Sequence, residues 1–226
     1  MNPIEVFIEF LRQALIKVDN DYYGLHWWND SMLNATMGEV ETKQRKAVKE
    51  LLDRYGERVF CYELYHQIRV LMDNHHLHNP RTFENVKLQS ELKKDYIGQI
   101  VQEYFNVEAL DSEYIPDFLL HTLGNFDNQF LIIEVKSNPQ LSFSGMKDDL
   151  LKIQQFITRY HYKKGVFLTI NTNPDRIKNA LEVEANKDWL RMNIANPERI
   201  TVMCKKKNDV PLYETSISAL IENNQN

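Results

Sequence analysis

The 226-residue sequence predicts an α/β fold in which helices flank a mixed central β-sheet. Two short apolar stretches, at residues 115–121 and 130–136, are separated by turn residues, a pattern typical of a β-hairpin. A helical pattern over residues 143–160 then leads to a buried strand over residues 164–171. Strand, helix and strand in this order form a crossover connection, so we expect the second and third of these strands to lie parallel.

Helices are expected before the hairpin. Apolar residues recur at helical spacing through residues 3–18 and again through residues 57–72. Residues 39–55 are charged and helical in pattern, and we expect Gly56 to mark a junction between two helices. Residues 75–78 include three histidines without the spacing of metal ligands, and we assign them to a loop.

Three further elements complete the predicted sheet and its helices. Residues 86–93 alternate like a strand, ahead of the hairpin. Asn173-Pro174 begins a helix that extends to about Leu190. Residues 200–205 form the last expected strand.

The length fits a single domain with a sizeable core. We place this core at residues 56–207, with an N-terminal helical extension over 1–55 and a polar tail over 208–226. Trp27 and Trp28 lie in the extension, where adjacent tryptophans are more often packing or interface anchors than base-stacking platforms. This extension is where we would look for a homodimer contact.

Composition excludes several classes of protein. No run of about 18 uncharged apolar residues is present, so we expect no membrane association through a spanning helix. The first residues lack the basic region and cleavage site of a signal peptide. Cys61 and Cys204 are too few for a disulfide framework or a zinc site. We therefore expect a cytoplasmic protein.

Charge is unevenly distributed along the chain. Residues 1–136 hold 14 Lys and Arg against 22 Asp and Glu, whereas residues 137–207 hold 13 against 7. A basic segment is where a phosphate backbone binds. Within it, Lys147 and Lys152 on the helix after the hairpin are our candidate nucleic-acid-binding residues.

The two hairpin strands carry charge where buried strands are usually apolar. Side chains alternate along a strand, so Glu134 and Lys136 share one face, and in a suitable register Asp117 meets them there. Two carboxylates brought together in this way repel and lose hydration, at a cost of several kcal/mol unless a cation joins them. A hard divalent cation with oxygen ligands supplies that charge.

This arrangement resembles the PD-(D/E)xK nuclease superfamily, the restriction-endonuclease-like phosphodiesterases. Pro116-Asp117 is similar to the PD element, and Glu134-Val135-Lys136 is similar to the ExK element. Each element alone is common, but here they occur in order, on apolar strands joined by a short connection. The resemblance implies a restriction-endonuclease-like fold with a mixed central sheet.

The resemblance also implies an activity, a cofactor and roles for residues. It implies a nuclease that hydrolyses phosphodiester bonds with Mg²⁺ or Mn²⁺, and DNA is the expected partner, although the residues leave DNA and RNA open. Asp117, Glu134 and the main-chain carbonyl of Val135 would hold the metal. Lys136 would orient or deprotonate the attacking water, or offset developing negative charge.

A helix before the hairpin often supplies another glutamate in this superfamily. Glu63 resembles that residue, and we expect it to assist the metal through water. His66 and Gln67 lie on the same helix face as Glu63 at positions i+3 and i+4, as possible support. Glu91, near the end of the strand before the hairpin, is a further candidate.

Two other classes of protein stay open. The same fold can bind nucleic acid or a partner protein without catalysis. The intact Asp117, Glu134 and Lys136 speak against this, because a binding module has no need of a self-repelling carboxylate pair. A structural or interaction protein that dimerises through its N-terminal helices is the other alternative, and it is compatible with nuclease activity.

Overall fold

The computed structural model describes residues 2–23, 42–91, 103–104, 106–124, 126 and 128–222, and over 42–54 it describes the backbone only. Trp27 and Trp28, named above as packing or interface anchors, lie outside these residues. No helix of the described chain is both long enough and apolar enough to cross a membrane.

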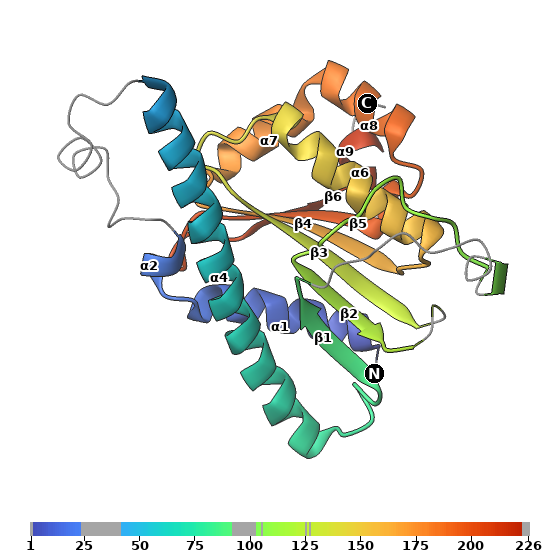
Figure 1. The fold of residues 1–226 in the computed structure, drawn as a ribbon. Helices are drawn as coiled ribbons and strands as arrows, with labels where there is room; N and C mark the ends of the chain where they lie inside the picture. The colour runs from blue at the N-terminus through green and yellow to red at the C-terminus, as the bar shows by residue number, and fades with distance from the viewer. Residues whose placement is uncertain are drawn as a thin grey trace.

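A six-stranded mixed sheet forms the centre of the molecule, with its strands in the order in which they occur in the chain (Figure 1). The central three strands are parallel to one another, and the remaining neighbours pair antiparallel. The strands are β1 (Val86–Ser90), β2 (Phe118–Thr122), β3 (Gln129–Ser137), β4 (Lys164–Ile170), β5 (Ile200–Lys205) and β6 (Tyr213–Ser216).

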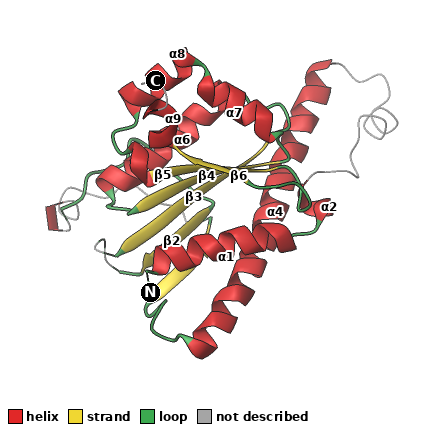
Figure 2. Ribbon diagram, turned by 180° about the vertical axis from the view of Figure 1, so that it is seen from behind, coloured by secondary structure: helices red, strands yellow, loops and turns green. Residues whose placement is uncertain are grey.

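Helices cover both faces of this sheet. One face carries α1 (Pro3–Lys17), α2 (Asn20–Tyr23) and the long α4 (Thr42–His78). The other face carries α6 (Phe143–Arg159), α7 (Pro174–Glu182), α8 (Glu184–Asn193) and α9 (Ile217–Glu222), with a short 3-10 turn at Pro197–Arg199. Seen from behind, α1 lies across the strands on the face opposite α6 (Figure 2).

Side chains along β3 point alternately to the two faces of the sheet, and each face has its own hydrophobic core. Leu131, Ile133 and Val135 pack with α1 and α4, whereas Ile132 packs with α6 on the opposite face. Because residues buried on both faces of a strand are apolar at nearly every position, the charged Glu134 is the exception in this central strand.

Both predicted strand arrangements are confirmed. β2 and β3 form the expected antiparallel pair, and α6 connects β3 to the parallel β4. The helix expected from Asn173 to Leu190 is instead two helices, α7 and α8, separated at Val183, whose backbone is extended.

The prediction of a junction at Gly56 is wrong. α4 continues through Gly56 and on to His78, so it also includes the histidines assigned to a loop. Packing against the sheet explains the difference: Phe60, Leu64 and Ile68 are fully buried. Burial of this stripe outweighs the roughly 1 kcal/mol that a glycine costs inside a helix.

The predicted core boundaries also differ from the structure. α1 is not an extension, because Phe7, Leu11 and Leu15 are fully buried in the core under the sheet. The region expected to be a polar tail contains β6, which pairs with β5, and α9, whose Ile217 and Leu220 are buried. Periodicity identified the apolar face of α1 but not the surface that covers it.

Candidate functional site

The β2–β3 register brings Asp117 and Glu134 side by side. Phe118 pairs with Ile133, so the next residues along each strand are Asp117 and Glu134. The backbone N–H of Val135 donates a hydrogen bond to Asp117 Oδ2 over 2.7 Å. This bond fixes the Asp117 carboxylate against β3, next to Glu134.

Glu134 lies at the centre of the site and is only 2% exposed. Its Oε2 accepts a hydrogen bond from Lys152 Nζ on α6 over 2.7 Å. Its Oε1 is buried and, among the described residues, has no hydrogen-bond partner. Burial raises the pKa of Glu134 well above its usual range, and the charge of Asp117 raises it further.

The ionised form of Asp117 is also disfavoured. Burial raises its pKa to about 7, in spite of the hydrogen bond from Val135, and the nearby Glu57 acts in the same direction. Two neighbouring carboxyl groups that both resist ionisation mark a position where a bound cation would be stabilising.

Lys136 and Lys152 share one partner, Asp149 of α6. Lys136 Nζ lies 3.1 Å from Asp149 Oδ2, and Lys152 Nζ lies 3.6 Å from Asp149 Oδ1. Burial alone would lower the pKa of Lys136, but the charges of Asp149 and Glu57 outweigh it, so the pKa is raised. Lys136 is therefore an ammonium group at neutral pH.

Glu57 of α4 completes the cluster. Its Oε2 accepts a hydrogen bond from the backbone N–H of Ser137, the last residue of β3, over 2.7 Å. Burial raises the pKa of Glu57, and the Ser137 N–H opposes this shift. We call six residues the carboxylate–lysine cluster: Glu57 of α4, Asp117 directly before β2, Glu134 and Lys136 of β3, and Asp149 and Lys152 of α6.

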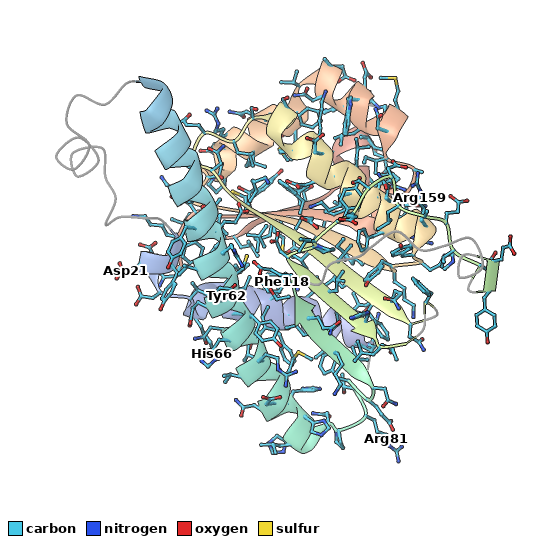
Figure 3. The ribbon with its side chains drawn as sticks, in the orientation of Figure 1. Asp21, Tyr62, His66, Arg81, Phe118 and Arg159 are labelled. Atoms are coloured by element: carbon cyan, nitrogen blue, oxygen red, sulfur yellow. The ribbon has the colours of Figure 1, made fainter. Side chains whose placement is uncertain are left out.

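The expected helper Glu63 does not join this cluster in the described contacts. Its carboxylate accepts a hydrogen bond from Gln67 over 2.7 Å. Glu63 follows Glu57 by six positions, which turns their side chains about 120° apart around the helix. His66 is exposed on the same helix (Figure 3). Glu57, and not Glu63, is therefore the α4 glutamate that meets β3.

Glu91 reaches the site through its backbone. Its N–H donates to the carbonyl oxygen of Asp117 over 3.2 Å, while its carboxylate binds Arg58 of α4 through both oxygens at 2.9 Å. Its φ of 51° is in the left-handed region, which is uncommon outside glycine. Tyr62, labelled on α4 in Figure 3, lies beside this pair: its hydroxyl accepts a hydrogen bond from Arg58 and donates one to Glu91 Oε2.

The two expected nucleic-acid-binding lysines lie in different environments. Lys147 Nζ sits over the rings of Phe143 and Trp189, 5.5 and 5.0 Å from their centroids. Lys152 is turned inward to Glu134, and its side chain is only 17% exposed. In this structure Lys152 pairs with a buried carboxylate and does not face solvent, and its binding to nucleic acid stays a prediction.

The oxygen donors present fit a hard divalent cation in part. Among the described residues, no group of three or more His, Cys, Asp or Glu side chains is arranged to hold a metal ion. Mg²⁺, however, is commonly bound by one or two carboxylates, with water and substrate phosphates completing the shell. Asp117 and Glu134, with the unpartnered Oε1 of Glu134, are compatible with such an incomplete shell.

Sequence reasoning missed Glu57, Asp149 and Lys152 as members of the cluster. A signal was present for each. Glu57 precedes the buried Cys61 and Leu64 by four and seven residues, which places it on the buried face of α4. Asp149 is a charged residue within the buried face of α6, and Lys152 follows it by three positions.

The fold and the cluster define an α/β chain with a mixed sheet and a buried, charged site at one end of its hairpin. Comparison with protein-family models, with curated proteins and with solved structures finds no match for this chain. The function must therefore be argued from the site.

Proposed function

We propose that this chain is a metal-dependent nuclease of the PD-(D/E)xK type, with a restriction-endonuclease-like core, that hydrolyses phosphodiester bonds in DNA. One observation carries the proposal: Asp117, directly before β2, lies beside Glu134 of the paired strand β3, with Lys136 two residues further on. The mixed sheet and the helix α6 after β3 support it, because they hold these residues on rigid elements.

Asp117, Glu134 and the carbonyl of Val135 would hold Mg²⁺ or Mn²⁺. When bound, such an ion polarises the scissile phosphate and lowers the pKa of a coordinated water. The chain itself contributes preorganisation, because the Val135 N–H and the β2–β3 pairing fix Asp117 before any substrate arrives.

Lys136 supplies positive charge beside the carboxylates. Because Asp149 holds it as an ammonium group, Lys136 is suited to donate a hydrogen bond to a phosphate oxygen or to the attacking water, and not to remove a proton. Glu57 is a positioning residue: its bond to the Ser137 N–H fixes the end of β3 that carries Lys136.

Titration calorimetry with Mn²⁺ is the first test. We expect the wild-type chain to bind Mn²⁺ and Asp117→Ala to show no binding. Asp148→Ala is a matched control, since Asp148 is an exposed aspartate on α6 next to the cluster residue Asp149. Retained binding in Asp117→Ala would place any metal elsewhere and contradict the proposed site.

Cleavage is the second test, with single- and double-stranded DNA and RNA assayed in Mg²⁺ and in EDTA. We expect Mg²⁺-dependent cleavage of DNA that is lost in Asp117→Ala. Cutting both strands of a duplex is simplest with two copies, so we propose a homodimer and would measure the molar mass in solution with and without DNA.

One observation favours a second candidate, an inactive nucleic-acid- or protein-binding module on the same fold. Lys152 and Lys136 already pair with Glu134 and Asp149, so part of the carboxylate charge is compensated without a cation. If the chain is such a binding module, EDTA should not change its affinity for nucleic acid. No cleavage should then occur in Mg²⁺ or Mn²⁺.

A further inference from the structure

Lys152 lies between two carboxylates that come from different elements. Its Nζ is 2.7 Å from Glu134 Oε2 on β3 and 3.6 Å from Asp149 Oδ1 on α6. Both carboxylates are largely buried, as is Lys152 itself. A short movement of the lysine side chain would therefore exchange its closer partner for the more distant one.

The carboxylate–lysine cluster has a charge that matches a divalent cation. Its four carboxylates, when ionised, exceed its two ammonium groups by two negative charges. A buried excess of charge is costly. Lys152 reduces the excess at Glu134, where Oε1 is buried without a partner among the described residues.

We propose that Lys152 is an internal counter-ion that competes with the divalent cation for Glu134. In the metal-free protein Lys152 pairs with Glu134, and when the cation binds, Lys152 moves to Asp149. This inference rests on the proposed function, because it requires the cation site at Asp117 and Glu134.

Asp149 is suited to receive the displaced lysine. Lys136 contacts its Oδ2 over 3.1 Å, whereas the nearest lysine contact of Oδ1 is the 3.6 Å approach of Lys152. The carboxylate can therefore hold one ammonium group on each oxygen. A single aspartate would then keep both lysines beside the cation, ready for a phosphate, while Glu134 is released.

The proposal makes opposite predictions for two variants. Lys152→Met removes the competitor and should strengthen Mn²⁺ binding about tenfold, which corresponds to about 1.4 kcal/mol. Asp149→Asn removes the charge that receives Lys152 and should weaken Mn²⁺ binding by a similar factor. Lys178→Met, an exposed lysine on α7, is the matched control and should bind Mn²⁺ like the wild type.

A metal-free measurement tests the ion pair itself. In EDTA, Lys152→Met leaves Glu134 without its lysine, so its unfolding temperature should fall below that of the wild type. The double variant Lys152→Met/Glu134→Gln should recover much of that loss, because no buried carboxylate is left unpaired. Saturating Mn²⁺ should likewise raise the unfolding temperature of Lys152→Met. It should not raise that of the double variant, which lacks the Glu134 carboxylate.

The outcomes separate this inference from the proposed function. If the wild type binds Mn²⁺ and Lys152→Met binds it equally or more weakly, Lys152 is a permanent structural partner and the displacement is overturned, while the nuclease proposal stands. If neither protein binds Mn²⁺ and no nucleic acid is cleaved, the cation site fails, and the displacement fails with it. Binding by Lys152→Met alone would support the competition directly.

Discussion

The two halves of β3 show how one strand serves two purposes. Residues 131–133 are apolar and buried between the helices on both faces, whereas residues 134–137 hold Glu134 and Lys136 among charged partners. Both halves pair with β4 in the same continuous register. The apolar half stabilises the fold, and the charged half holds Glu134, whose burial disfavours its ionised form. The proposed function is thus located where stability is locally reduced.

The largest expected effect concerns activity in the charged half. Glu134→Gln should lower the rate of Mg²⁺-dependent cleavage by two to three orders of magnitude, about 3–4 kcal/mol, because it removes a proposed metal-binding carboxylate. Single-turnover rates under saturating Mg²⁺ measure this. Glu198→Gln, at an exposed glutamate, should cleave like the wild type. Cleavage at the normal rate in Glu134→Gln would remove Glu134 from the mechanism.

The next effect concerns stability in the apolar half. Ile132 is fully buried against α6, so Ile132→Ala should lower the free energy of unfolding by about 3 kcal/mol through lost burial and a residual cavity. Urea unfolding followed by circular dichroism measures this, with the exposed Leu123→Ala as control. Below its unfolding midpoint, Ile132→Ala should still bind Mn²⁺. Loss of Mn²⁺ binding in the folded variant would show that the charged half of β3 depends on the packing of the apolar half.

A smaller effect, of opposite sign, is expected for Asp117→Asn in EDTA. Because the pKa of Asp117 rises from its ordinary 3.8 to about 7 on folding, the folded state holds a proton that the unfolded state has released between these pH values. Wild-type stability should therefore fall as pH rises from 4 to 7, and remain lower above 7. Asp117→Asn avoids this loss and should be more stable than the wild type at pH 8. We expect about 2 kcal/mol, half of what the shift alone would give, because Asp117 is partly exposed to solvent.

Thermal unfolding in EDTA at pH 4, 6 and 8 measures the difference between Asp117→Asn and the wild type. The difference should be smallest at pH 4, where the side chain is neutral in both folded proteins and only about half ionised in the unfolded wild type. Saturating Mn²⁺ at pH 8 should reverse the order, because it binds only the wild-type site. A variant that is less stable than the wild type at every pH would show that the ionised Asp117 is already compensated.

The smallest effect distinguishes the two glutamates of α4. Glu57→Gln keeps an acceptor for the Ser137 N–H but removes the charge, so cleavage should fall about tenfold, or about 1.4 kcal/mol. Glu63→Gln should remain within about twofold of the wild type, because Glu63 pairs with Gln67 outside the cluster. The reverse ranking would restore Glu63 as the helper residue that the sequence suggested.

The helix phase shows why part of the site escaped prediction. The charged strand positions Asp117, Glu134 and Lys136 were identified from the sequence because a charge in a buried strand has few structural explanations. On a helix, charged residues are common, and only the exact orientation distinguishes Glu57 from Glu63. That orientation depends on how α4 packs on the sheet, which no local pattern contains.

The fold was also predictable only in part, for the same reason. The hairpin and the crossover through α6 followed from short-range patterns and connection lengths. The burial of α1 and the pairing of β6 depend on contacts with residues far away in the chain. The ion pair between Arg12 of α1 and Glu214 of β6, 202 residues apart, is one example. Such contacts leave little trace in the sequence around either partner.

The order of the strands has a consequence for the newborn chain. Since each strand lies beside its predecessor in the sequence, the sheet can grow one strand at a time as the protein leaves the ribosome. Glu134 emerges 18 residues before Lys152, its lysine partner. At about 5–20 residues per second, this leaves the glutamate without that partner for about one to four seconds. Until α6 covers this face of the sheet, Glu134 is hydrated and pays no burial cost, so the pairing with Lys152 and the burial of Glu134 arrive together.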